Sequence, residues 1–290
     1  MSDPGGRRTR VLSVEASLFS ARPPSEVAVA AASLPQLFRP GAPGIACDVR
    51  VVDAASPLWP QDLARVLDTP VRGILLAAPT MTDAAGVAAV AEKAENTHRP
   101  VVVAMPFACD AAVRDGLSRI GAEGEPLSFI DSIATVPDDG VRTRSSALGA
   151  ALLAQLVAIR IVAGPVPGLT MNYETDCAYS AVAVTGGMTV TLAGLVSAVG
   201  PPSLRVDLVG ARHRHTACLT GPYAAPATFR SYGPAGTSRP SLSHESGLRT
   251  AWQNLHAAVT SGQPVRFGLR ELTHDLAAAA GRLRARPAIG

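Results

Sequence analysis

Hydrophobic residues follow two different patterns in the two halves of the chain. In the first half, short runs of β-branched and aliphatic residues alternate with stretches in which apolar residues recur every three or four positions. The runs are typical of buried strands and the stretches of amphipathic helices, so their alternation indicates βαβ units on a parallel sheet. The predicted strands are Arg10–Val14, Val49–Val52, Gly73–Ala77, Val101–Ala104 and Leu127–Ile130, and the predicted helices are Pro60–Leu67, Thr82–Glu95 and Cys109–Ile120.

The second half begins with one long apolar helix, predicted over Ser145–Ala163 and ended by Gly164 and Pro165. Strand-like runs then follow one another without helices between them, which indicates an antiparallel sheet. These runs are Tyr179–Thr185, Thr189–Val196, Leu204–Val209 and His213–Leu219; Gly221–Pro240 is predicted to be a loop, and Ser246–Ser261 and Leu269–Arg286 two closing helices.

These elements predict an α/β fold in which a Rossmann-like parallel sheet is followed by an α+β domain with an open antiparallel sheet. Residues 1–9 are predicted to be a disordered N-terminus. Residues 10–137 form the predicted Rossmann-like domain, and residues 138–290 the α+β domain, whose C-terminal helices pack back.

The composition of the chain argues against several classes of partner. The chain has 290 residues, 17% charged residues, 4% aromatic residues and a net charge of +3, which argues against a nucleic-acid partner. Four widely spaced cysteines show no metal-ligand spacing and are typical of small buried residues in a reducing compartment. Arg160 interrupts the most apolar segment, so no membrane partner is predicted. We therefore expect a cytoplasmic protein without a metal site.

Several segments resemble motifs of one oxidoreductase family. In the first half, one predicted strand is followed by Ala78 and Pro79, and another by Met105 and Pro106. The second half contains a predicted hairpin and a strand with the pattern "L-x-V-x-G". In this order they resemble the glucose-fructose oxidoreductase and inositol dehydrogenase family (Gfo/Idh/MocA), and the thiazolinyl imine reductases in particular. The segments are Gly73–Pro79, Arg99–Pro106, Pro126–Asp131, Leu152–Pro165, Ala178–Ser197, Leu204–Gly210, Leu248–Arg282 and Trp252–Pro264.

The resemblance implies an NAD(P) cofactor, but the sequence departs from the family at that site. A dinucleotide fold needs glycines after its first strand, where the backbone approaches the pyrophosphate. Here Val11–Val14 runs into Glu15 and on to Ser20 without a glycine. Asp53 stands where a ribose-binding acid would be, and it has that role only if a dinucleotide binds. We therefore predict no cofactor, with NADPH kept for the alternative function below.

The positions that match the family's catalytic residues also carry side chains that cannot transfer a proton. Met105 stands where the family's "E-K-P" motif has lysine, and Ala108 replaces a histidine of the imine reductase version. The family's "D-x-G-x-H" helix pattern falls on Ala150, Leu152 and Ala154. Side chains without an ionisable proton cannot act as general acids or bases.

The first functional hypothesis is therefore a non-redox subunit of a specialised, natural-product biosynthetic pathway, binding a small molecule or an enzyme partner; a repurposed non-redox enzyme remains open. The alternative is an NAD(P)H-dependent imine or carbonyl reductase with an atypical cofactor loop. The ligand, a free or carrier-bound pathway intermediate, is expected at the carboxyl ends of the parallel strands. The residues predicted to line this pocket are Thr80, Met105, Pro106, Tyr173 and Glu174.

The antiparallel sheet is the predicted surface for pairing, either with a second copy of the chain or with a homologue. Val182 and Val184 alternate along one strand, and Val190 and Leu192 along the next. We expect these four residues to leave one face of the sheet apolar, and an exposed apolar face marks an interface.

Overall fold

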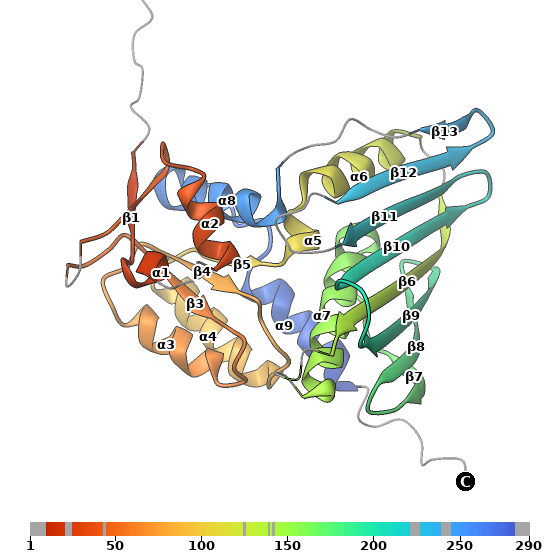
Figure 1. Cartoon of the computed structure of the whole chain (residues 1–290), viewed down its shortest axis with the longest axis horizontal. Coiled ribbons are helices and arrows are strands. Elements are labelled where there is room, and N and C mark those ends of the chain that lie inside the picture. The colour runs from red at the N-terminus through yellow and green to blue at the C-terminus, as the bar shows by residue number, and fades with distance from the viewer. Residues whose placement is uncertain are drawn as a thin grey trace, which may run out of the picture.

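The structure, a computed structural model, describes residues 10–20, 25–42, 45–123, 126–138, 140, 143–220, 227–238 and 245–281. These residues form two layers, each built on one β-sheet, with one long helix between them (Figure 1). The predicted disorder of residues 1–9 lies outside the described residues.

The first layer is a parallel sheet of five strands in the order β2-β1-β3-β4-β5. Four of these strands confirm the sequence prediction. The fifth, β2, was not predicted because it is only three residues long and ends in a proline. The strands are β1 (Leu12–Val14), β2 (Phe38–Pro40), β3 (Val49–Asp53), β4 (Gly73–Ala77) and β5 (Val101–Ala104).

Helices cover both faces of this sheet, which explains why β4 and β5 are continuously apolar and buried. On β4, Leu76 packs toward one hydrophobic cluster and Leu75 toward another on the opposite face. The first face is covered by α3 (Trp59–Leu67), α4 (Ala84–Asn96) and α9 (Leu269–Ala280), and the second by α2 (Glu26–Ala32) and α8 (Gly247–Ser261).

The second layer is a mixed sheet of eight strands in the order β13-β12-β11-β10-β6-β9-β8-β7. Short helices α5 (Pro106–Cys109) and α6 (Ala111–Glu123) connect the first layer to it. Its strands are β6 (Leu127–Pro137), β7 (Thr170–Glu174), β8 (Ala178–Thr185), β9 (Met188–Ser197), β10 (Ser203–Gly210), β11 (Arg214–Thr220), β12 (Thr228–Gly233) and β13 (Gly236–Ser238).

Three predictions about this sheet are wrong. The strand predicted at Leu127–Ile130 belongs to β6 in the middle of the second sheet, not to the parallel sheet. Because β6 pairs in parallel with β9 and antiparallel with β10, the sheet is mixed rather than antiparallel. The expected loop Gly221–Pro240 contains the hairpin of β12 and β13. Local sequence does not specify which sheet a strand joins, so only long-range pairing decided these points.

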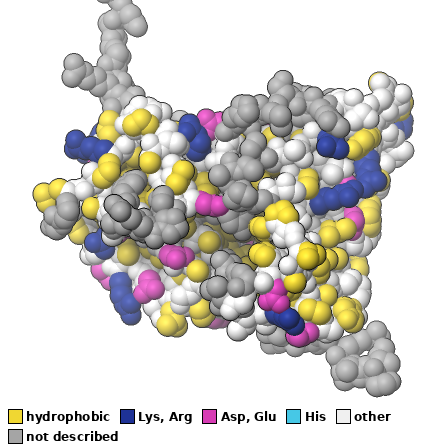
Figure 2. All heavy atoms as spheres, in the orientation of Figure 1, with side chains coloured by type: hydrophobic (Ala, Val, Ile, Leu, Met, Phe, Trp, Pro, Cys, Tyr) yellow, Lys and Arg dark blue, Asp and Glu magenta, His cyan; other side chains and the backbone are white. Residues whose placement is uncertain are grey.

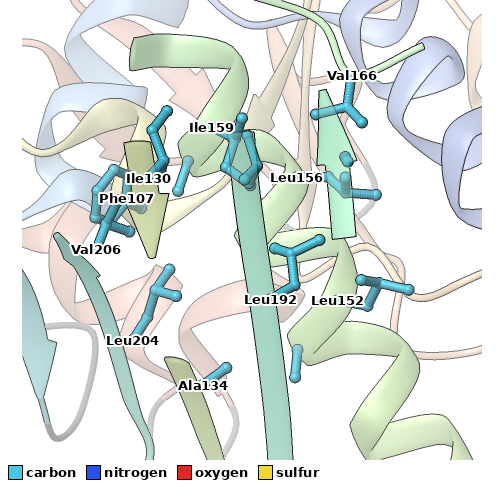
Figure 3. Packing of buried hydrophobic residues seen from close by; sticks show 14 of the residues in the cluster. Phe107, Ile130, Ala134, Leu152, Leu156, Ile159, Val166, Leu192, Leu204 and Val206 are labelled. Atoms are coloured by element: carbon cyan, nitrogen blue, oxygen red, sulfur yellow. The ribbon is translucent and has the colours of Figure 1, made fainter. Parts of the chain in front are cut away.

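Helix α7 (Arg144–Ala163) lies between the two layers and is apolar on all sides. Leu152, Leu156 and Ile159 point into the core beneath the second sheet, where Leu192 of β9 meets them (Figure 3). Leu153 and Val157 pack into the core of the first layer. By length and composition α7 could cross a membrane, but 61% of its apolar window is buried inside the protein. It is therefore the central core helix.

Polar side chains fix the position of α7. Gln155 is fully buried; its Nε2 donates to the carbonyl oxygens of Ser132 at 2.9 Å and Ala193 at 3.0 Å, and its Oε1 accepts from the Tyr179 hydroxyl. One turn further on, Arg160 makes a bidentate ion pair with the buried Asp275 of α9. These contacts tie the helix to the second sheet and to α9.

We predict that Gln155→Leu lowers the free energy of unfolding by about 2 kcal/mol, because it removes the three hydrogen bonds that the buried Gln155 amide makes with Ser132, Ala193 and Tyr179. The measurement is equilibrium unfolding in urea. Gln263→Leu is the control, since Gln263 is exposed. Equal stability of the two variants would show that Gln155 does not hold α7 to the sheet.

Candidate functional site

A cavity of about 470 Å³ lies between the two layers. The carboxyl ends of β4 and β5 form one wall, and α7 with β6, β10 and β11 forms the opposite wall. Hydrophobic side chains gather in this region of the surface (Figure 2). The lining residues are Glu26, Val27, Ala78, Pro79, Thr80, Ala104, Met105, Pro106, Phe107, Ala134, Thr135, Val136, Pro137, Ala147, Ala150, Ala151, Ala154, Pro202, Ser203, Leu204, Leu219 and Leu248.

Small side chains on α7 create much of this space. Ala147, Ala150, Ala151 and Ala154 line the cavity and recur at the spacing of one helical face. A larger residue at any of these positions would project into the cavity. The volume is within the range typical of small-molecule sites, which are mostly apolar with a few polar groups.

The wall at the end of β4 is held in an unusual backbone conformation. Ala78 has φ of +49°, a region that residues with a Cβ atom rarely adopt. Next to it, the Thr80 hydroxyl donates to the carbonyl oxygen of Ala54 at 3.0 Å, and Trp59 Nε1 donates to the carbonyl oxygen of Thr80 at 3.3 Å. Such strain persists where surrounding contacts enforce it and is common at ligand sites.

The wall at the end of β5 depends on one glycine. Gly247 begins α8 and lies so close to Pro106 that a Cβ atom there would stand 2.2 Å from the Pro106 carbonyl oxygen. Only glycine permits this approach of α8 to α5, and it brings Leu248 into the cavity wall.

Three of the five predicted pocket residues lie together here: Thr80, Met105 and Pro106 all line the cavity. Tyr173 and Glu174 do not line it. Both are exposed residues of β7, the edge strand of the second sheet, where Tyr173 pairs with Ser180 and Glu174 with Tyr179. The sequence suggested a loop over the pocket, but backbone pairing with β8 places this segment at the sheet edge.

Glu26 was missed by the sequence analysis and is the one ionisable residue among the described lining residues. Ser25 caps α2 by accepting from the Ala28 amide, and Trp252 Nε1 donates to the Val27 carbonyl oxygen at 3.1 Å. These contacts fix the start of α2 and place Glu26 at the cavity. Ser25 before an alanine-rich run is a sequence signal for the start of a helix, but the sequence does not indicate that this start faces the cavity.

The residues after β1 do not fit a dinucleotide. Glu15 does not line the cavity; its Oε1 accepts the Val51 amide of β3 at 2.9 Å. The Glu15 carboxylate is therefore engaged with β3 rather than directed into the cavity. Helix α1 (Ser17–Ser20) is four residues long, and the carboxylate that lines the cavity at a helix start is Glu26. Neither a glycine nor a cation is present among the described lining residues to receive phosphate.

The other positions that match the family's cofactor and catalytic residues place no ionisable group at the cavity. Asp53 is exposed, outside the cavity lining, and its Oδ1 accepts the Ala55 amide at 3.0 Å. Ala150 and Ala154 do line the cavity, whereas Leu152 is buried in the core. Among the described residues no group of three or more His, Cys, Asp or Glu side chains could hold a metal ion.

Two buried groups at the C-terminal end of α5, Cys109 and Asp110, have structural roles. Burial raises the pKa of the Cys109 thiol to about 11. Desolvation also raises the pKa of Asp110, which accepts the backbone amides of Ala112, Val113 and Ala227. The thiol is therefore not a nucleophile near neutral pH, and the carboxylate joins α6 to the start of β12.

Comparison with solved structures identifies the fold. The chain matches UDP-N-acetylglucosamine 3-dehydrogenase from Acidithiobacillus ferrooxidans at a TM-score of 0.70 and 14% identity, over 95% of this chain and 98% of that one. It matches an oxidoreductase from Thermotoga maritima at a TM-score of 0.72 and 13% identity, over 95% and 97%. It matches biliverdin reductase from Synechocystis, in complex with biliverdin and NADP⁺, at a TM-score of 0.62 and 14% identity, over 94% and 97%.

No protein-family model and no curated protein matches the sequence. The solved structures show that the chain shares its two-layer fold with these oxidoreductases, which confirms the predicted resemblance at the level of the fold. At this identity the likeness does not extend to activity. The finer resemblance to thiazolinyl imine reductases stays a prediction.

We predict that iodoacetamide at pH 8 modifies Cys177, which is exposed, and leaves Cys109 unmodified. With a pKa of about 11, only about 0.1% of the Cys109 thiol is ionised at pH 8, and the thiolate is the reacting species. Peptide mass spectrometry of the native and the urea-unfolded protein measures this. Equal labelling of both cysteines in the native protein would contradict the burial of Cys109.

Proposed function

We propose that this protein is a non-redox binding protein that uses an oxidoreductase fold to hold a small molecule between its two layers. The observation that carries the proposal is the chemistry of the cavity lining. The lining keeps the fold's ligand position at the carboxyl ends of the parallel strands, but offers alanine and methionine where the related enzymes need ionisable groups.

The ligand we propose is an intermediate of a specialised, natural-product biosynthetic pathway, either free or attached to a carrier. We also propose that the protein acts in the cytoplasm. Methionine, phenylalanine and leucine side chains give an adaptable apolar surface for the body of such a molecule. The few polar side chains, Thr80, Thr135 and Ser203, can orient it.

A second candidate function is an NAD(P)H-dependent imine or carbonyl reductase with an atypical cofactor loop. One observation favours it: the fold is shared with a biliverdin reductase whose structure holds NADP⁺. The described cavity lining contains no glycine or cation for a pyrophosphate, which weighs against this candidate, so cofactor binding is the discriminating measurement.

We predict that the protein binds neither NADPH nor NADH with a dissociation constant below about 1 mM, and that Met105→Lys does not create hydride transfer. The physical reason is that the described lining lacks a phosphate site upstream of Met105, and one lysine does not supply it. Calorimetric titration measures binding, and NADPH absorbance with imine and carbonyl substrates measures turnover.

Synechocystis biliverdin reductase serves as the positive control for NADP(H) binding. Micromolar binding of NADPH by the unaltered protein, or NADPH oxidation by Met105→Lys, would favour the reductase instead.

We also propose that the outer face of the second sheet pairs with a second copy of the chain or with a homologue. The expectation that Val182, Val184, Val190 and Leu192 share one face is wrong. Val182 pairs with Thr191 and Ala183 with Val190. Hence the two β8 valines face outward, while Val190 and Leu192 are buried in the core.

The outer face is therefore mixed in character. Exposed Ile133, Leu195 and Val184 lie on its central strands and β8. Toward β10 and β11, Arg205 and Arg214 both pair with the carboxylate of Asp207. Apolar area beside paired charges is typical of a non-obligate interface, in which a polar rim surrounds an apolar centre.

We predict that Ile133→Glu combined with Leu195→Glu converts an oligomer to a monomer, because the like charges are desolvated in the interface. Light scattering coupled to size-exclusion chromatography measures the mass. Val29→Glu on α2, another exposed apolar position, is the control. A monomeric unaltered protein at high concentration that also captures no homologue would contradict this interface.

A further inference from the structure

The cavity carries a single charge. Of its described lining residues, Glu26 alone is ionisable, and the remainder are apolar apart from two threonines and one serine. No lysine or arginine of the described chain lines the cavity. The only lysine, Lys93, lies on α4 and pairs with Asp68 at 2.7 Å.

Glu26 also differs from the carboxylates that stabilise the fold. Glu15 accepts the Val51 amide, and Asp275 pairs with Arg160. Glu26 makes no hydrogen bond or ion pair within the described chain, although it is half-buried and its position is fixed by the start of α2. No partner for its charge is therefore present among the described residues, and a ligand in the cavity can supply one.

An unpaired carboxylate at an apolar wall selects among ligands by charge. A ligand ammonium group gains a charge-assisted hydrogen bond there, while a ligand carboxylate or phosphate is repelled. The apolar remainder of the lining favours an apolar body attached to that group.

We propose that the cavity binds an apolar amine, with the protonated nitrogen at the Glu26 carboxylate and the apolar body against the alanine face of α7. This inference rests on the proposed binding function and adds the chemical class of the ligand. It also gives a positive reason why phosphorylated cofactors are disfavoured, since the same carboxylate repels them.

The test uses three probes that share one ring system: 1-naphthylmethylamine, 1-naphthylmethanol and 1-naphthoic acid. Calorimetric titration of the full chain at pH 7 compares their affinities. We expect the amine to bind at least tenfold more tightly than the alcohol and the acid to bind most weakly. Glu26→Gln should lower the amine affinity at least tenfold, to that of the alcohol, and leave the alcohol unchanged.

Two variants serve as controls. Glu92→Gln on the exposed side of α4 changes the net charge equally outside the cavity and should leave all affinities unchanged. Ala150→Phe fills the cavity and should abolish binding of the amine and the alcohol.

The outcomes separate the two proposals. One set of results would contradict the amine inference but leave the apolar binding function standing. In that set the amine and the alcohol bind equally, Glu26→Gln has no effect, and Ala150→Phe abolishes the binding of both. If no probe binds at millimolar concentration, or if Ala150→Phe leaves binding unchanged, both the ligand class and the binding function are wrong.

Discussion

The structure depends on the burial of α7. A helix that is apolar on every side cannot lie on a protein surface without exposing one of its faces, so it must be covered from more than one direction. Here the second sheet covers one side, through Leu152 and Leu156, and the first layer covers another, through Leu153 and Val157. The two layers are therefore held together by one shared helix, and the polar anchors Gln155 and Arg160 fix its rotation and depth.

The cavity is a consequence of the same helix. Where α7 carries leucine, isoleucine or valine, these side chains fill the space between the two layers. Where it carries Ala147, Ala150, Ala151 and Ala154, part of that space stays open as the cavity. Cavities between layers cost stability because their walls lose packing contacts. The strained backbone at Ala78 and the close approach of Gly247 to Pro106 shape the opposite wall. The small side chains on one face of α7 and the backbone geometry of the opposite wall therefore define the site together.

The chain keeps the fold of nucleotide-dependent oxidoreductases while its charged groups are arranged differently. In such enzymes the region after β1 approaches phosphate, for which backbone amides must be free. Here the segment after β1 carries the Glu15 carboxylate, which accepts the Val51 amide of β3, and a second carboxylate, Glu26, lines the cavity. A fold of this kind tolerates such changes because its stability resides in the sheets and α7, whereas ligand chemistry resides in loop ends and helix starts.

The sequence by itself determined four of the five strands of the parallel sheet, the long helix and the two closing helices. Each of these has a strong local signal: β4 and β5 are continuous apolar runs, α7 is stopped at Gly164, and Ser246 caps the start of α8. It also placed Thr80, Met105 and Pro106 at one site, because the carboxyl ends of neighbouring parallel strands meet at one edge. Only the tertiary structure decided that β6 joins the second sheet, that Tyr173 lies on an edge strand, and that Glu26 rather than Glu15 faces the cavity. The positions of β6 and Glu26 depend on contacts between residues far apart in the chain, and the position of Tyr173 depends on the pairing of β7 with β8. Such contacts leave no periodic signal in the local sequence.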